Sequence, residues 1–90
     1  MTDKTNITEV APTFRVQWEE AQDCWVVLYP EGMVKLSQSA GEIMKRVNGV
    51  LSIGSIIEEI ETAFSDNNLE QDILKFMEVA YGNGWIRNKK

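Results

Sequence analysis

The hydrophobic pattern of this chain changes its period near residue 37, and this change limits the folds that the chain can adopt. Residues 14–18, FRVQW, alternate between apolar and polar, as in a strand with one buried face. Residues 24–29, CWVVLY, are apolar on both faces, as in a central strand. The turn sequence Pro-Glu-Gly at residues 30–32 then leads into a short strand over residues 33–36. The pattern therefore predicts an antiparallel meander with the second strand in the middle.

After residue 37 the apolar residues recur every three or four positions, which predicts three amphipathic helices. Their apolar positions are Ala40, Ile43, Met44 and Val47 in the first helix, Ile53, Ile56, Ile57, Ile60, Ala63 and Phe64 in the second, and Leu69, Ile73, Phe76, Met77 and Ala80 in the third.

Capping residues indicate where these helices begin and end. Ser37 or Ser39 is able to cap the first helix, and Ser39 with Glu42 fits a capping box. The expected caps of the other two helices are Ser52 and Asn68 with Gln71. The expected stops are Asn48-Gly49 after the first helix and Gly82 and Gly84 after the third. We assign Ser37 to the end of the third strand.

Three strands followed by three helices predict one α+β domain, because 90 residues have room for a single modest core. The expected architecture is winged-helix-like, with a three-stranded antiparallel meander followed by a three-helix bundle. We assign residues 13–87 to this domain, residues 1–12 to a flexible N-terminal arm and residues 88–90 to a free tail. Ile7 and Val10 are the residues of the arm that are able to dock on the domain.

The acidic composition and the lack of histidine disfavour several classes of function. Fourteen acidic residues against nine basic ones give a net charge of −5, which disfavours binding to nucleic acid or to an anionic membrane. The chain lacks the commonest general base and zinc ligand, and its one cysteine, Cys24, lies in a predicted buried strand. We therefore expect a non-enzymatic protein without metal or cofactor. No segment resembles a signal peptide or a membrane span, so we expect a cytoplasmic location.

Residues 17–43, QWEEAQDCWVVLYPEGMVKLSQSAGEI, resemble the PqqD family of pyrroloquinoline quinone biosynthesis. The specific part is LYPEGMVKL followed by a Ser-Ala helix start. Later matches are Asn48-Gly49, Ile56-Ile57, Leu69-x-x-Asp72-Ile73 and a closing Trp85-Ile86. The resemblance covers about residues 13–86. One departure is Ser37, where members of the family usually carry Asn, and Ser retains the capping function.

The resemblance implies a peptide chaperone. PqqD proteins bind the ribosomal precursor peptide PqqA and present it to the radical SAM enzyme PqqE, which carries the iron–sulfur clusters and S-adenosylmethionine. In the wider family of recognition domains for ribosomal peptides, the leader peptide adds as a strand beside the third strand, in a groove walled by the third helix. Carried over to this sequence, the implied peptide-binding residues are Met33, Val34, Lys35, Leu36, Leu69, Asp72, Ile73, Phe76 and Met77.

The residue pattern alone also fits a simpler interpretation of these positions. Val34 and Leu36 suit a strand that packs on the core, and Lys35 suits a guard against edge-to-edge aggregation. The apolar residues of the third helix suit ordinary helix packing. Asp72 either suits the first turn of a helix by its charge or pairs with a basic residue of a peptide.

Two alternative functions remain open from the sequence. A stand-alone recognition domain of another ribosomal peptide pathway has the same pattern. A winged-helix fold also occurs in DNA-binding proteins, but the predicted third helix carries Glu70, Asp72 and Glu78 against Lys75 alone, which disfavours DNA.

Overall fold

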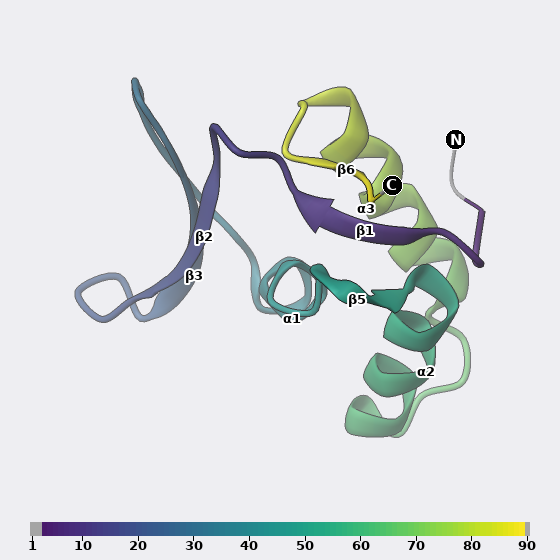
Figure 1. Cartoon of the computed structure of the whole chain (residues 1–90). Coiled ribbons are helices and arrows are strands. Elements are labelled where there is room, and N and C mark those ends of the chain that lie inside the picture. Colours follow the sequence, from purple (N-terminus) through teal and green to yellow (C-terminus); the bar gives the residue numbers. More distant parts are fainter. Residues whose placement is uncertain (1–2, 90) are drawn as a thin grey trace.

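The computed structural model describes residues 3–89. Within these residues, six strands and three helices form two sheets with helices between and beside them (Figure 1). In chain order they are β1 (Ile7–Val10), β2 (Arg15–Glu19), β3 (Cys24–Tyr29), β4 (Gly32–Lys35), α1 (Gln38–Met44), β5 (Asn48–Ser52), α2 (Ile53–Phe64), α3 (Glu70–Gly82) and β6 (Ile86–Asn88).

The predicted meander is present, with the strand order β2-β3-β4 and β3 in the middle. Both pairings are antiparallel, and Val27 of β3 lies between Val16 of β2 and Val34 of β4. Val27 is fully buried in the main core, and Val16 and Val34 pack against it. Val26 points to the opposite face and is also buried, flanked by Gln17 and Lys35. The apolar sequence of β3 therefore reflects burial on both faces.

A second three-stranded sheet, with the order β5-β1-β6, corrects the predicted element order. The segment expected to be a flexible arm supplies β1, which pairs antiparallel with both neighbours. Asn48-Gly49, expected to stop a helix, begins β5 instead, and Asn88 of the expected free tail belongs to β6. Lys89 N–H also donates to the Ile7 carbonyl at 2.8 Å. The remaining tail residue, Lys90, and residues 1–2 of the arm lie outside the described residues.

Helix α1 packs closely on the meander because Gly41 faces Trp25. A Cβ atom at Gly41 would lie 2.8 Å from Trp25 Cδ1, so only glycine allows this approach. The helix begins at Ser37, whose hydroxyl accepts a hydrogen bond from Ala40 N–H at 3.2 Å. Of the two expected caps, Ser37 is therefore the one used, and the preferred capping box at Ser39 is wrong because the chain turns into the helix soon after β4.

The caps of the other two helices agree only in part with the predictions. Ser52 caps α2 as expected and accepts a hydrogen bond from Ser55 N–H at 3.1 Å. Helix α3 begins after Leu69, which makes no side-chain capping bond, so the predicted Asn68 cap is wrong. Gly84 adopts a φ of 77° just beyond α3, which fits its expected role in ending the helix.

The main core lies where α1, α2, α3 and β3 meet. Its fully enclosed side chains come from each of these elements: Val27, Met44, Ile53, Ile56, Met77 and Ala80. Burying such side chains contributes about 1.5–3 kcal/mol each, so this cluster fixes the positions of α1 and α3 relative to the meander.

Candidate functional site

A cavity of about 280 Å³ opens between the three helices, and we call it the helix cavity. Four of the nine predicted site residues line it, all from α3 or its start: Leu69, Asp72, Ile73 and Phe76. The other lining residues come from α1, its Ser37 cap and α2: Ser37, Ser39, Ala40, Ile43, Ile60 and Phe64. The structure thus brings four of the five residues predicted on the third helix into one cavity.

The helix cavity has an apolar floor, aromatic walls and a polar rim. Ile43, Ile60 and Ile73 are at most 4% exposed and form its floor. Phe64 is 39% exposed and Phe76 is half-buried, so the rings of both walls reach solvent. This arrangement suits an apolar side chain of a ligand, because the ligand would cover aromatic surface that water now contacts.

Polar groups surround the mouth of the helix cavity. Asp72 is exposed, and the hydroxyls of Ser37 and Ser39 lie 3.4 Å apart. The Ser37 hydroxyl is already used as the cap of α1. Asp72 therefore offers the charged group of the rim, in a position to meet a basic residue beside the apolar one.

An ion-pair network holds two walls of the helix cavity together. Arg46 donates to Glu42 on α1 at 2.7 Å and to Glu59 on α2 at 3.1 Å. The hydrogen bond from Arg46 holds the pKa of the Glu42 carboxyl below its usual range. Glu42 therefore remains charged at neutral pH and keeps α1 tied to α2.

Two predicted site residues, Leu36 and Met77, lie in the core. Met77 has no exposed surface and Leu36 is 7% exposed. Neither lines the helix cavity, so each supports the site by packing. Phe64 was missed by the sequence reasoning. Its position at the end of the apolar face of α2 fitted ordinary packing equally well, and only the tertiary structure places it in the same cavity as Phe76.

Met33, Val34 and Lys35 lie on β4, an outer strand of the meander. Hydrogen-bonded and non-bonded pairs alternate along antiparallel strands. Leu36 N–H donates to the Trp25 carbonyl at 2.9 Å, so Val34, two residues away, also bonds toward β3. The backbone groups of Met33 and Lys35 consequently point away from the sheet. They form an open edge that an extended chain is able to pair with.

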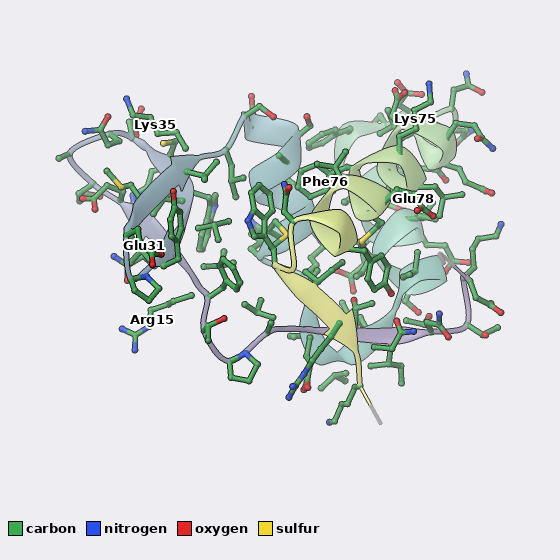
Figure 2. The ribbon with its side chains drawn as sticks, turned by 90° about the horizontal axis from the view of Figure 1, so that it is seen from above. Arg15, Glu31, Lys35, Lys75, Phe76 and Glu78 are labelled. Carbon is green, nitrogen blue, oxygen red and sulfur yellow. The ribbon has the colours of Figure 1, made fainter. Side chains whose placement is uncertain are left out.

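The open edge and the helix cavity lie on either side of the start of α1. Figure 2 shows Lys35 on the meander and Phe76 on α3, with α1 between them. Ser37, two residues beyond the end of β4, lines the helix cavity. The C-terminal end of β4 therefore leads to the rim of the helix cavity.

The described residues contain no group of three or more His, Cys, Asp or Glu side chains placed to hold a metal ion. Among these residues there is also no helix with the length and apolar character needed to cross a membrane.

Comparison with known proteins identifies the family. Residues 24–86 match the family model described as Coenzyme PQQ synthesis protein D (PqqD). The chain belongs to the PqqD family. The PqqA binding protein of Azotobacter vinelandii is 44% identical over 86 residues, which cover 94% of each chain. The PqqA binding protein of Pseudomonas paraeruginosa is 50% identical over 74 residues, which cover 81% of this chain and 80% of that protein.

A solved PqqD structure shares the fold. The solution NMR structure of the PqqD truncation of Methylobacterium extorquens PqqCD, described as a ribosomal peptide recognition element, matches with a TM-score of 0.78. The match covers 97% of this chain and 95% of the other at 18% identity. The predicted family is thus confirmed. The relatives are named as binding proteins, and membership of PqqD confirms the prediction of a non-enzymatic protein.

Proposed function

We propose that this chain binds the precursor peptide PqqA and presents it to the radical SAM enzyme PqqE in pyrroloquinoline quinone biosynthesis. The observation that carries the proposal is that the open edge of β4 leads, past Ser37, to the rim of the helix cavity. Relatives that match over most of their length are named PqqA binding proteins, which supports PqqA as the peptide.

In the proposed complex, an extended segment of PqqA pairs with β4 through the outward N–H and C=O groups of Met33 and Lys35. Main-chain hydrogen bonds supply affinity without reading the peptide sequence. An apolar side chain beyond this segment enters the helix cavity between Phe64 and Phe76, and a basic neighbour meets Asp72. These side-chain contacts supply specificity.

This protein is able to present PqqA to PqqE because it holds one segment of the peptide and leaves the rest free. A precursor fixed along β4 and α3 keeps its other residues extended and available to an enzyme, which raises their effective concentration there. The single cysteine of the chain is too few for an iron–sulfur cluster, so the clusters belong to the enzyme. We place this function in the cytoplasm, where a lone cysteine stays reduced.

The test is a proline on the open edge. Lys35→Pro removes the outward N–H and leaves the bonds between β4 and β3 in place. We expect PqqA binding to fall by at least about tenfold, since the variant loses a backbone hydrogen bond and the peptide cannot approach the proline ring. Calorimetric titration with synthetic PqqA measures the effect, and circular dichroism checks the fold.

Lys35→Ala is the matched control, because it removes the same side chain and keeps the N–H; its affinity should stay close to that of the wild type. Val34→Pro should instead lower stability, because the Val34 N–H bonds toward β3. If folded Lys35→Pro binds PqqA as tightly as Lys35→Ala, the peptide does not add to β4.

A further inference from the structure

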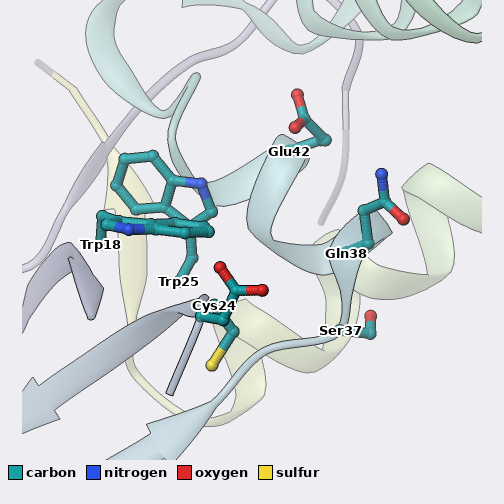
Figure 3. A pocket seen from close by; sticks show the side chains of 7 residues that line it. Trp18, Cys24, Trp25, Ser37, Gln38 and Glu42 are labelled. Carbon is teal, nitrogen blue, oxygen red and sulfur yellow. The ribbon is translucent and has the colours of Figure 1, made fainter. Parts of the chain in front are cut away.

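A second cavity, of about 360 Å³, lies on the other side of the start of α1, and we call it the Trp18 pocket. Figure 3 shows its walls: Trp18 and Trp25 from the meander stand on one side, and Gln38 and Glu42 of α1 on the other. Asp23 also lines it, from the turn between β2 and β3. The proposed function makes no use of this pocket.

The aromatic wall of the Trp18 pocket is partly open to solvent. Trp18 stands edge-on to Trp25, with ring centroids 5.8 Å apart and an interplanar angle of 73°. It is nevertheless 43% exposed, which is unusual for so large an apolar ring. Its indole N–H donates to Glu20 at 3.2 Å, which holds the ring in place. Trp18 thus presents a fixed aromatic surface rather than completing the core.

The charged groups that line the Trp18 pocket are acidic. They are Asp23 and Glu42, and neither lysine nor arginine lines the cavity. Glu42 is engaged by Arg46 and Lys45, whereas Asp23 forms no ion pair with the residues that the structure describes. An aromatic face beside a carboxylate attracts a cation through both the ring quadrupole and the charge. The pocket therefore suits the side chain of a lysine or an arginine.

The Trp18 pocket and the helix cavity adjoin each other at the start of α1. Ser37 lines both of them, and it also lines a shallow depression between them, together with Gln38, Ser39 and Phe64. Gln38 is shared between this depression and the Trp18 pocket, and Phe64 between the depression and the helix cavity. A chain that passes Ser37 thus lies beside both cavities.

We propose that the bound precursor peptide, where it passes Ser37 between β4 and the helix cavity, places a lysine or arginine side chain in the Trp18 pocket, against Trp18 and Asp23. The inference rests on the proposed function, because the position beside the helix cavity is what selects the peptide as the occupant. The Trp18 pocket would be a second specificity site, for a basic residue of the peptide. The first residues of α1 separate it from the helix cavity, which takes the apolar residue.

The test combines pocket variants with peptide variants. Asp23→Asn removes the charge and keeps the shape, and Asn tolerates the φ of 55° found at this position. Trp18→Leu removes the aromatic face and keeps an apolar side chain. Glu58→Gln is the matched control, since it makes the same change in charge on α2, away from the pocket. The ligands are synthetic PqqA and copies in which each Lys or Arg is replaced in turn by norleucine.

We expect Asp23→Asn and Trp18→Leu each to weaken PqqA binding by roughly three- to tenfold, and Glu58→Gln to leave it unchanged. The loss from Asp23→Asn should shrink between about 0.05 and 0.5 M salt. One of the norleucine peptides should bind the wild-type protein more weakly than PqqA does, by the same factor as Asp23→Asn weakens binding of PqqA. The affinity of this peptide should not fall further when the protein carries Asp23→Asn. Because the two changes then do not add, the residue replaced by norleucine is the one that occupies the pocket.

Two outcomes overturn the inference and leave the proposed function intact. In the first, PqqA binds tightly and neither pocket variant changes its affinity. In the second, the variants weaken only the association with PqqE, which would assign the pocket to the enzyme. Failure of wild-type protein to bind PqqA at all would instead overturn the proposed function together with the inference.

Discussion

Thr8 lies in the middle strand of the second sheet with no exposed surface, and its hydroxyl has no hydrogen-bond partner among the described residues. A buried hydroxyl without a partner costs about 1–3 kcal/mol, and valine has nearly the same shape without the polar atom. We expect Thr8→Val to raise the free energy of unfolding by about 1 kcal/mol, which raises Tm by roughly 4–8 °C. Thermal unfolding measures it. Thr8→Ser, which keeps the hydroxyl and loses a methyl group, should lower Tm. Equal stability of Thr8→Val and wild type would mean that the hydroxyl is satisfied.

Gly41 is required by the contact between α1 and the meander. In an exposed helix, Gly→Ala stabilises by about 1 kcal/mol. At position 41 the new Cβ would lie 2.8 Å from Trp25 Cδ1 and 3.0 Å from Trp25 Cβ, so we expect Gly41→Ala to destabilise by about 1–3 kcal/mol. Urea unfolding compares it with Gly82→Ala, where no atom outside the neighbouring residues and backbone of its own helix lies within 4 Å of the new Cβ. If Gly41→Ala unfolds no more easily than Gly82→Ala, the helix shifts without cost.

At the scale of elements, α3 has one face toward the core and one toward the helix cavity. Met77 is fully buried and Phe76 is half-buried, although they are neighbours in sequence. We expect Met77→Ala to cost about 2–5 kcal/mol of stability. Phe76→Ala should cost less stability, because Phe76 is only half-buried where it packs against the edge of the core and against Trp85, at a centroid distance of 6.4 Å. It should nevertheless weaken PqqA binding by over about 2 kcal/mol.

Parallel thermal melts and peptide titrations of the two variants decide this prediction. Ile73, buried at 3% exposure but lining the helix cavity, should show both effects when truncated. If Phe76→Ala binds PqqA normally, or loses binding only by unfolding, the helix cavity is not a peptide site.

The elements that the sequence predicted correctly are those whose own hydrophobic pattern is strong. The alternation in residues 14–18 and the Ile repeats of α2 each identify their element without help from distant residues. Strands β1 and β5, with the sequences ITEV and NGVLS, are short and half polar. Their pairing joins residues far apart in the chain, such as Ile7 with Ser52 and Val10 with Ile86, so no local signal predicts them.

For the candidate site too, the local sequence pattern was not sufficient. The α3 residues of the helix cavity were predicted from the family resemblance, and their spacing alone fitted core packing equally well. Which of them is exposed depends on how α1 and α2 pack against α3. The separation of Phe76 from Met77 therefore required the tertiary structure.

At the scale of the whole molecule, β1 links the N-terminal part of the chain to its central and C-terminal parts. It pairs with β5 from the centre of the chain and with β6 from its C-terminal end (Figure 1). An ion pair between Glu9 and Arg87, at 2.8 Å, reinforces the second contact. The residues just before β1 also serve α2, because the carbonyls of Lys4 and Asn6 accept from Gly54 and Ile53 N–H, each at 2.8 Å. The N-terminal segment thus acts as a structural part of the domain.

Removing residues 1–10 should therefore destabilise the whole domain. The deletion leaves β5 and β6 without the strand between them and exposes the first N–H groups of α2. We expect Tm to fall by more than about 10 °C, or cooperative unfolding to be lost, and PqqA binding to fall with it. The control lacks residues 1–3 and retains the carbonyls of Lys4 and Asn6, so its Tm should stay within about 4 °C of the full chain. Calorimetric melts of the three proteins measure the difference. Similar melting of all three would mean that β1 contributes little and that the N-terminal segment behaves as an arm after all.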